Sequence, residues 1–247
     1  MLYFYEPRLG TWYTERRAKP LKRIEMPKLK SKCASRCKVN RKTLALAKKG
    51  DGDALLAVGC AAYTNGDYKT AMKYYEAAAE KGVTQALVNL GYCHYYGRVT
   101  PVDYERAFQC FSKAAAEDED VSPEAFFKLG DMYLWGNYVE KDPSAAFKLF
   151  VRAYETACSW TSQFGDDADE TDDVNFTGLL RADAAKRLGD CYRYGTGCEK
   201  NMFLAFRYYA EAERLFAKKA SLGDQFAPSL YAKAREALDA VRDEIAP

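Results

Sequence analysis

Histidine is the side chain best suited to acid–base chemistry at neutral pH, and this sequence contains one, His94. A mechanism that needs two histidines is therefore excluded, and a Ser-His-Asp triad would have to form around this residue. His94 stands where other copies of an internal repeat have tyrosine, so we expect a structural role. The glycines of 195–197 lack the preceding strand of a phosphate-binding loop and indicate a turn. We expect a protein that is not an enzyme, with no catalytic residue, cofactor or metal site.

The eight cysteines could supply thiol chemistry. Four of them fall in apolar helical segments and are expected as small buried side chains in a reducing compartment: Cys60, Cys93, Cys110 and Cys191. Cys33 and Cys37 are one helical turn apart among Lys and Arg, which lower a thiol pKa; they form either a redox or metal pair or two unpaired thiols. Cys198 could form a partial disulfide. A thiol-based enzyme using His94 is an alternative to a binding protein.

The charge of the chain divides at about residue 50. Residues 1–50 contain 15 Lys and Arg against 3 Glu, whereas the remainder has a balance of −10. Residues 1–40 lack helical periodicity and are expected as an extended basic arm that also carries aromatic residues such as Tyr3 and Trp12. Cations beside aromatic rings bind single-stranded nucleic acid, so residues 1–50 could bind it. The alternatives are docking on the acidic body, in the same or a neighbouring chain, and a solvated tail.

Residues 159–175 form a second charged segment, with six Asp and Glu and no Lys or Arg. They lack the D-x-D-x-D-G order of helix–loop–helix calcium sites. We therefore expect an acidic loop inserted between two copies of the repeat.

Outside these two charged segments, one sequence pattern recurs four times. Each copy has a glycine within apolar residues at helical spacing: Gly59, Gly91, Gly130 and Gly189. A turn glycine follows: Gly66, Gly97, Gly136 and Gly195. An Asp or Asn then caps a second helix: Asp67, Asp103, Asp142 and Asn201. Because glycine costs about 1 kcal/mol inside a helix, the first glycine predicts a close approach of the neighbouring helix. An aromatic-rich pair in each second helix, such as Tyr74–Tyr75, should wedge between helices.

The stretches LG-x-x-Y-x-x-G at 129–136 and 188–195, and D-x-x-x-A at 103–107 and 142–146, resemble the Sel-one-like repeat family, a branch of the tetratricopeptide superhelices. The resemblance implies an all-α, right-handed superhelix of about four two-helix repeats. We place the repeats at about 51–82, 83–119, 121–158 and 177–222 within a solenoid of residues 41–247. A half-unit helix at 41–49 leads in, and a closing helix at 226–244 caps the end.

Solenoids of this kind bind partners on the concave face lined by first helices. Counting from the recurring glycine predicts the residues that face this groove: Tyr63, Tyr92, Tyr95, Phe127, Asp131, Trp135, Lys186, Asp190 and Arg193. The sequence thus predicts a non-catalytic scaffold that binds a protein or peptide segment. Inter-repeat packing is the other interpretation of these residues, the tyrosines above all.

The expected location follows from two negative observations. No stretch approaches the roughly 18 uncharged apolar residues of a membrane helix, and the first residues do not resemble a secretory signal. We expect a cytoplasmic protein, and the sequence does not indicate an oligomeric state.

Overall fold

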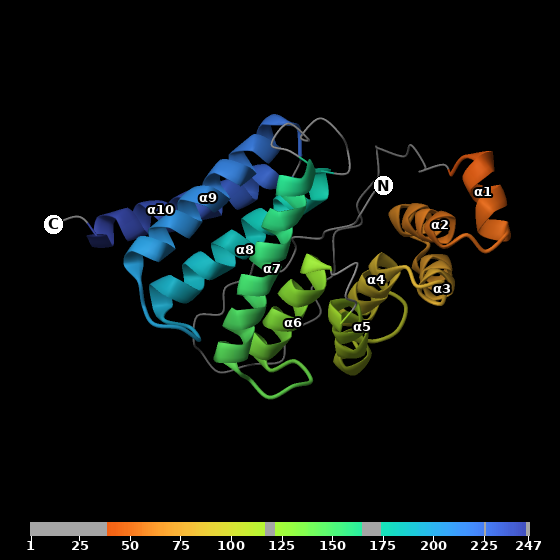
Figure 1. Cartoon of the computed structure of the whole chain (residues 1–247), viewed down its shortest axis with the longest axis horizontal. Coiled ribbons are helices and arrows are strands. Elements are labelled where there is room, and N and C mark those ends of the chain that lie inside the picture. Colours follow the sequence, from red (N-terminus) through yellow and green to blue (C-terminus); the bar gives the residue numbers. More distant parts are fainter. Residues whose placement is uncertain (1–38, 117–121, 165–173, 225, 246–247) are drawn as a thin grey trace.

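A computed structural model describes residues 39–116, 122–164, 174–224 and 226–245, without the side chains of 160–164 and 174–179. The described chain folds into α-helices: α1 Arg41–Lys48, α2 Gly52–Thr64, α3 Tyr68–Ala79, α4 Thr84–Tyr95, α5 Tyr104–Ala116, α6 Pro123–Trp135, α7 Pro143–Phe164, α8 Val174–Tyr194, α9 Met202–Ser221 and α10 Ala227–Ile245. They succeed one another from α1 at one end to α10 at the other (Figure 1). The predicted all-α solenoid is confirmed; the basic arm lies outside the described residues up to residue 38.

Each repeat is held together by contact between the glycine of its first helix and an aromatic ring of its second helix. A Cβ on any of the four glycines would lie 2.5–2.7 Å from a ring carbon, well inside van der Waals contact. The pairs are Gly59 with Tyr75, Gly91 with Phe111, Gly130 with Phe150, and Gly189 with Tyr209. All four rings are at most 2% exposed. The predicted close approach and the wedging of the aromatic residues are both confirmed.

The second helices begin at the predicted caps. Backbone amides donate to the side chains of Asp67, Asp103, Asp142 and Asn201 at distances of 2.9–3.1 Å. These bonds satisfy amides that have no partner within the helix. The glycine that ends each first helix has a positive φ, 72° at Gly136, a conformation that costs glycine little.

The two outermost helices are half-units at opposite ends of the solenoid. The connection from α1 to α2 repeats that from α3 to α4: Gly50 and Gly82 have φ of 82° and 83°. The amides of Asp51 and Val83 donate to the carbonyls of Leu46 and Ala78 in the same way. Helix α1 therefore occupies the place of the second helix of a repeat. Helix α10 packs against α9 with Ala234, Leu238 and Val241 buried.

The structure narrows the acidic insertion expected at 159–175. Helix α7 continues to Phe164, and α8 begins at Val174. Residues 159–164 contain no proline, glycine or acidic residue that would end α7, and Ala157 is fully buried just before them. The acidic residues 166–173 lie outside the described residues. Helix α8 thus begins three residues before residue 177, where we expect the fourth repeat to start.

The glycine contact leads to a stability prediction in which two effects have opposite signs. Helix propensity alone would make Gly130→Ala about 1 kcal/mol more stable. The new methyl group would lie 2.5 Å from Phe150, and overpacking of this kind costs about 1–3 kcal/mol. We expect a net loss in the free energy of unfolding, measured by urea denaturation. Adding Phe150→Leu should recover part of the loss, and a stabilised Gly130→Ala variant would contradict the packing argument.

Candidate functional site: the surface and polar network of the first helices

The structure buries three of the nine predicted groove residues. Tyr92, Phe127 and Asp131 are 8%, 4% and 5% exposed. The Tyr92 ring packs edge-on against Phe111 of its own repeat, and Phe127 packs against Phe150. For these three, packing in the interior is the interpretation that the structure supports, because neighbouring helices already cover their side chains.

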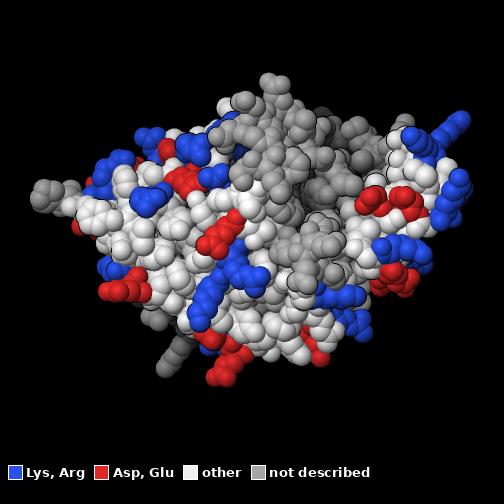
Figure 2. Space-filling model, viewed as in Figure 1, with Lys and Arg blue, Asp and Glu red and all other residues white. Residues whose placement is uncertain are grey.

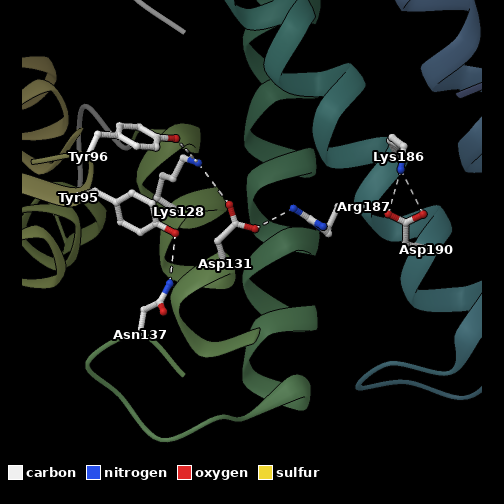
Figure 3. A network of polar contacts seen from close by, with 8 residues as sticks. All are labelled: Tyr95, Tyr96, Lys128, Asp131, Asn137, Lys186, Arg187 and Asp190. Atoms are coloured by element: carbon white, nitrogen blue, oxygen red, sulfur yellow. Dashed lines mark hydrogen bonds and ion pairs between the residues drawn. The ribbon is translucent and has the colours of Figure 1, made fainter. Parts of the chain in front are cut away.

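A buried cation joins the second and third repeats. Lys128 of α6 is 6% exposed, and its ammonium lies 5.4–5.8 Å from the ring centroids of Tyr92, Tyr95 and Tyr96 of α4. It donates to the Tyr96 hydroxyl at 3.3 Å and to the Asp131 carboxylate at 3.3 Å (Figure 3). Burial opposes the charge of Lys128, but Tyr96 and Asp131 more than offset it, so that its pKa lies well above the ordinary value. The ring faces and the carboxylate thus keep a lysine charged between repeats.

The same carboxylate continues the network to the fourth repeat. Arg187 of α8 donates to Asp131 at 2.9 Å, so one buried acid links cations of two helices (Figure 3). Further along α8, Lys186 pairs with Asp190 at 3.1 Å, and the buried Tyr209 hydroxyl donates to Asp190 at 2.7 Å. Each of these predicted or neighbouring charges therefore already has a partner within the chain.

Sequence reasoning missed Lys128 and Arg187, although a signal was present. Both stand two residues before the repeat glycine, and the same position holds Asn89 in the second repeat. Asn89 is 9% exposed and its amide contacts the Cys60 sulfur at 3.7 Å. A polar residue recurring at one position of an otherwise apolar helix indicates a buried polar contact between consecutive first helices.

The remaining predicted residues lie nearer the surface. Tyr63 and Tyr95 are half-buried and accept hydrogen bonds from Arg98 and Asn137. Arg193 pairs with Glu244 of α10 and lies over the ring of Tyr194. Trp135 is 50% exposed and Tyr194 is 64% exposed. Among the predicted residues Trp135 therefore offers the largest free aromatic surface.

Trp135 belongs to a row of aromatic residues. The residue directly before the turn glycine is aromatic in three successive first helices: Tyr96, Trp135 and Tyr194. Because these positions are equivalent in the repeat, the three side chains lie at the same end of α4, α6 and α8. The exposure rises along the row from the half-buried Tyr96 to Tyr194.

His94 and the described cysteines belong to the packed interior. His94 is 6% exposed, and its Nδ1 has no hydrogen-bond partner among the described residues. Cys60, Cys93 and Cys191 are buried, as expected, and form no disulfide among the described residues, whereas Cys110 is half-buried against the core that contains Cys60 and Cys93. Cys198 is free, so the considered disulfide is absent from the described part of the chain. Cys33 and Cys37 lie outside the described residues.

Two-helix units stacked in register around a glycine–ring contact define an α-helical repeat protein. The Sel1 repeat family matches residues 52–83, 84–119, 123–155 and 182–215, which together are more than half of the sequence, and the chain belongs to this family. Sel1 repeat proteins are generally protein-interaction scaffolds and typically non-catalytic.

Two curated relatives and one solved structure show how far the likeness extends. Protein sel-1 homolog 2 of Mus musculus is 38% identical over 90 residues, which is 36% of this chain and 13% of that protein. The Rattus norvegicus protein of the same name gives the same values. The chain thus spans only a small part of these relatives. The crystal structure of a Sel1 repeat protein from Oxalobacter formigenes has a TM-score of 0.53 and 22% identity, covering 82% of this chain and 76% of that one. This likeness shows the fold.

Within the described ranges, none of the helices combines the length and apolar character needed to cross a bilayer. No cluster of three His, Cys, Asp or Glu side chains suited to a metal ion was found in the same ranges.

The shared carboxylate should matter for stability. Asp131→Asn would remove the carboxylate that the buried Lys128 shares with the half-buried Arg187, and breaking a buried ion pair of this kind costs about 3–5 kcal/mol. We expect a loss of this size in the free energy of unfolding from urea denaturation. Asp239→Asn, which removes an exposed carboxylate paired with Arg242, is the control and should have little effect. Equal losses in the two variants would contradict the proposed importance of Asp131.

The buried histidine should make stability depend on pH. Burial, with a smaller contribution from Arg106, lowers the pKa of His94 below its ordinary value near 6.5, although Asp103 and Glu76 oppose the shift. As the pH falls through about 6.5 the unfolded chain therefore takes up a proton that the folded chain does not, and stability falls. The stability profile from pH 7.5 to 5.5 should be less steep in His94→Tyr, which restores the residue found at Tyr133 and Tyr192. Parallel profiles for the two proteins would contradict this assignment.

Proposed function

We propose that this protein is a non-catalytic scaffold that holds a segment of another protein along the concave face of its first helices. The observation that carries the proposal is the row of Tyr96, Trp135 and Tyr194 at one repeat position. A single exposed aromatic residue needs no explanation. Here an aromatic residue recurs at one position of three repeats, and Trp135 and Tyr194 are at least half exposed. A partner could therefore contact several aromatic side chains on one surface.

The chemistry of the row suits protein recognition. Tyr and Trp offer a large apolar area together with a polar group, and they dominate the binding energy of protein interfaces. Because the three rings stand at one repeat position, a partner segment crossing three first helices would meet one ring per repeat. An extended or a helical segment could supply apolar side chains at this spacing.

Polar contacts within the chain support the same proposal because they restrain two positions of the row. Tyr96 accepts a hydrogen bond from Lys128, and Arg193, directly before Tyr194, is fixed by Glu244. Of the charged residues predicted for the groove, Arg193 would thus position the surface, whereas Trp135 and Tyr194 would contact the partner. An aromatic surface that is already ordered before the partner binds lowers the entropic cost of binding.

Nucleic acid binding through residues 1–50 stays a prediction. Only 39–50 of that range are described, where α1 and the residue after it expose Arg41, Lys42, Lys48 and Lys49. On the face shown in Figure 2 the acidic and basic side chains are interspersed rather than gathered by sign. If the full chain does not bind oligonucleotides even at low salt, this alternative is contradicted.

The scaffold proposal predicts that binding depends on the row. A protein captured by the full chain and identified by mass spectrometry should bind at least ten-fold more weakly to the double variant Trp135→Ala, Tyr194→Ala, because both anchors are removed. The control is Phe203→Ala, which removes an aromatic residue that is 72% exposed on α9. Unchanged thermal unfolding shows that the variants are folded. Equal affinity for the double variant, measured by titration calorimetry, would contradict the proposed surface.

A further inference from the structure

Tyr138 occupies a backbone position that the fourth repeat gives to glycine. The turn after α8 contains Gly195 and Gly197 with φ of 68° and 75°, and the turn after α6 has Gly136 and Tyr138 at the same two positions with φ of 72° and 71°. A side chain in the left-handed region is sterically disfavoured, whereas glycine adopts it freely. The repeat does not need a tyrosine here, so its presence requires another reason.

The substitution changes how consecutive repeats meet. Gly197 packs so closely on the start of α7 that a Cβ would overlap the carbonyl oxygen of Pro143. Tyr138 instead contacts helix α5 of the preceding repeat. Its ring centroid lies 5.6 Å from that of Phe108, and its hydroxyl donates to Glu105 at 3.4 Å. Beside it a shallow cavity of about 540 Å³ opens, lined by residues 100–106 and Tyr138.

The cavity combines aromatic and apolar surface with one available carboxylate. Tyr138, Val102 and Tyr104 are 53%, 50% and 36% exposed. Arg106 turns back towards its own Asp103, at 3.4 Å. The exposed Glu105 contacts Tyr138 as described and can also accept a hydrogen bond from a cation. Aromatic grooves of this kind bind proline-containing extended segments, and a carboxylate at the edge favours one with lysine or arginine.

We propose that this cavity binds residues 19–30 of the same chain. The segment contains Pro20 and Pro27, five Lys and Arg against one Glu, and the apolar residues Leu21, Ile24, Met26 and Leu29. Proline favours extended backbone in the residue before it and lowers the entropy lost on binding. The segment therefore has the chemistry that the tyrosines and Glu105 would recognise.

The start of α1 places the segment within reach of the cavity. Because α1 joins α2 as α3 joins α4, its first residues lie at the edge where α3 and α5 begin, which is the edge of the cavity. The eight residues 31–38 can span about 28 Å when extended, which is about three times the separation of two packed helices.

The proposal is tested in the full chain with a photo-reactive benzoylphenylalanine in place of Leu21, which leaves the cavity intact. After irradiation, mass spectrometry of the monomer should show cross-links to peptides containing residues 99–108 or 136–141. Tyr138→Gly, which restores the glycine of the repeat, should reduce their yield at least ten-fold. Phe203→Ala, which removes an exposed aromatic side chain on α9, should leave the yield unchanged.

Three results would overturn the proposal: cross-links that persist undiminished in Tyr138→Gly, cross-links found only between two copies of the chain, and cross-links absent or confined to other surfaces. Circular dichroism of Tyr138→Gly shows whether its fold is retained. Val102→Lys provides a second variant, which removes apolar surface and adds a charge of the same sign as the segment, so it should lower the yield without altering the turn. Trp135 and Tyr194 are unchanged throughout, so the outcome is independent of the scaffold surface.

Discussion

The close contact between a glycine and an aromatic ring sets the geometry on which the solenoid depends. In each repeat the absence of one Cβ lets the second helix bring a Tyr or Phe ring against the first helix, as Phe150 lies against Gly130. The ring is thereby removed from water, and burying an aromatic side chain contributes several times the cost of the helical glycine. Four such contacts fix the pairing of helices, and the stacking of the pairs follows.

Between repeats, polar contacts have a different role. Asp131 holds Lys128 and Arg187 from two neighbouring helices, and three tyrosine rings surround the lysine. Buried ion pairs are weak evidence for stability, since desolvation offsets much of their attraction. A shift of one first helix relative to the next would nevertheless be unfavourable, because it would separate Asp131 of α6 from Arg187 of α8. The network thus aligns consecutive first helices and the aromatic residues at their ends.

The two surfaces that we propose for binding are places where the repeat leaves side chains uncovered. Trp135 and Tyr194 end first helices, where the following turn does not cover them. Tyr138 packs beside Phe108 with half of its side chain exposed, whereas Gly197 at the equivalent position packs against Pro143. Both sites differ from the interior in the same respect: the aromatic side chain there is larger than the packing of the repeat requires.

The sequence by itself determined the helices, their order and their caps, because glycine, Asp and aromatic residues recur at fixed spacing and act on nearby backbone. It also named Trp135 as a surface residue. It could not separate Trp135 from Tyr92 and Phe127, which share the helical face but are covered by rings from other helices. Nor did the spacing of residues in the sequence reveal that Asp131 forms ion pairs with both Lys128 and Arg187. Only the tertiary structure decided these points, because burial and ion pairing depend on which distant segments meet.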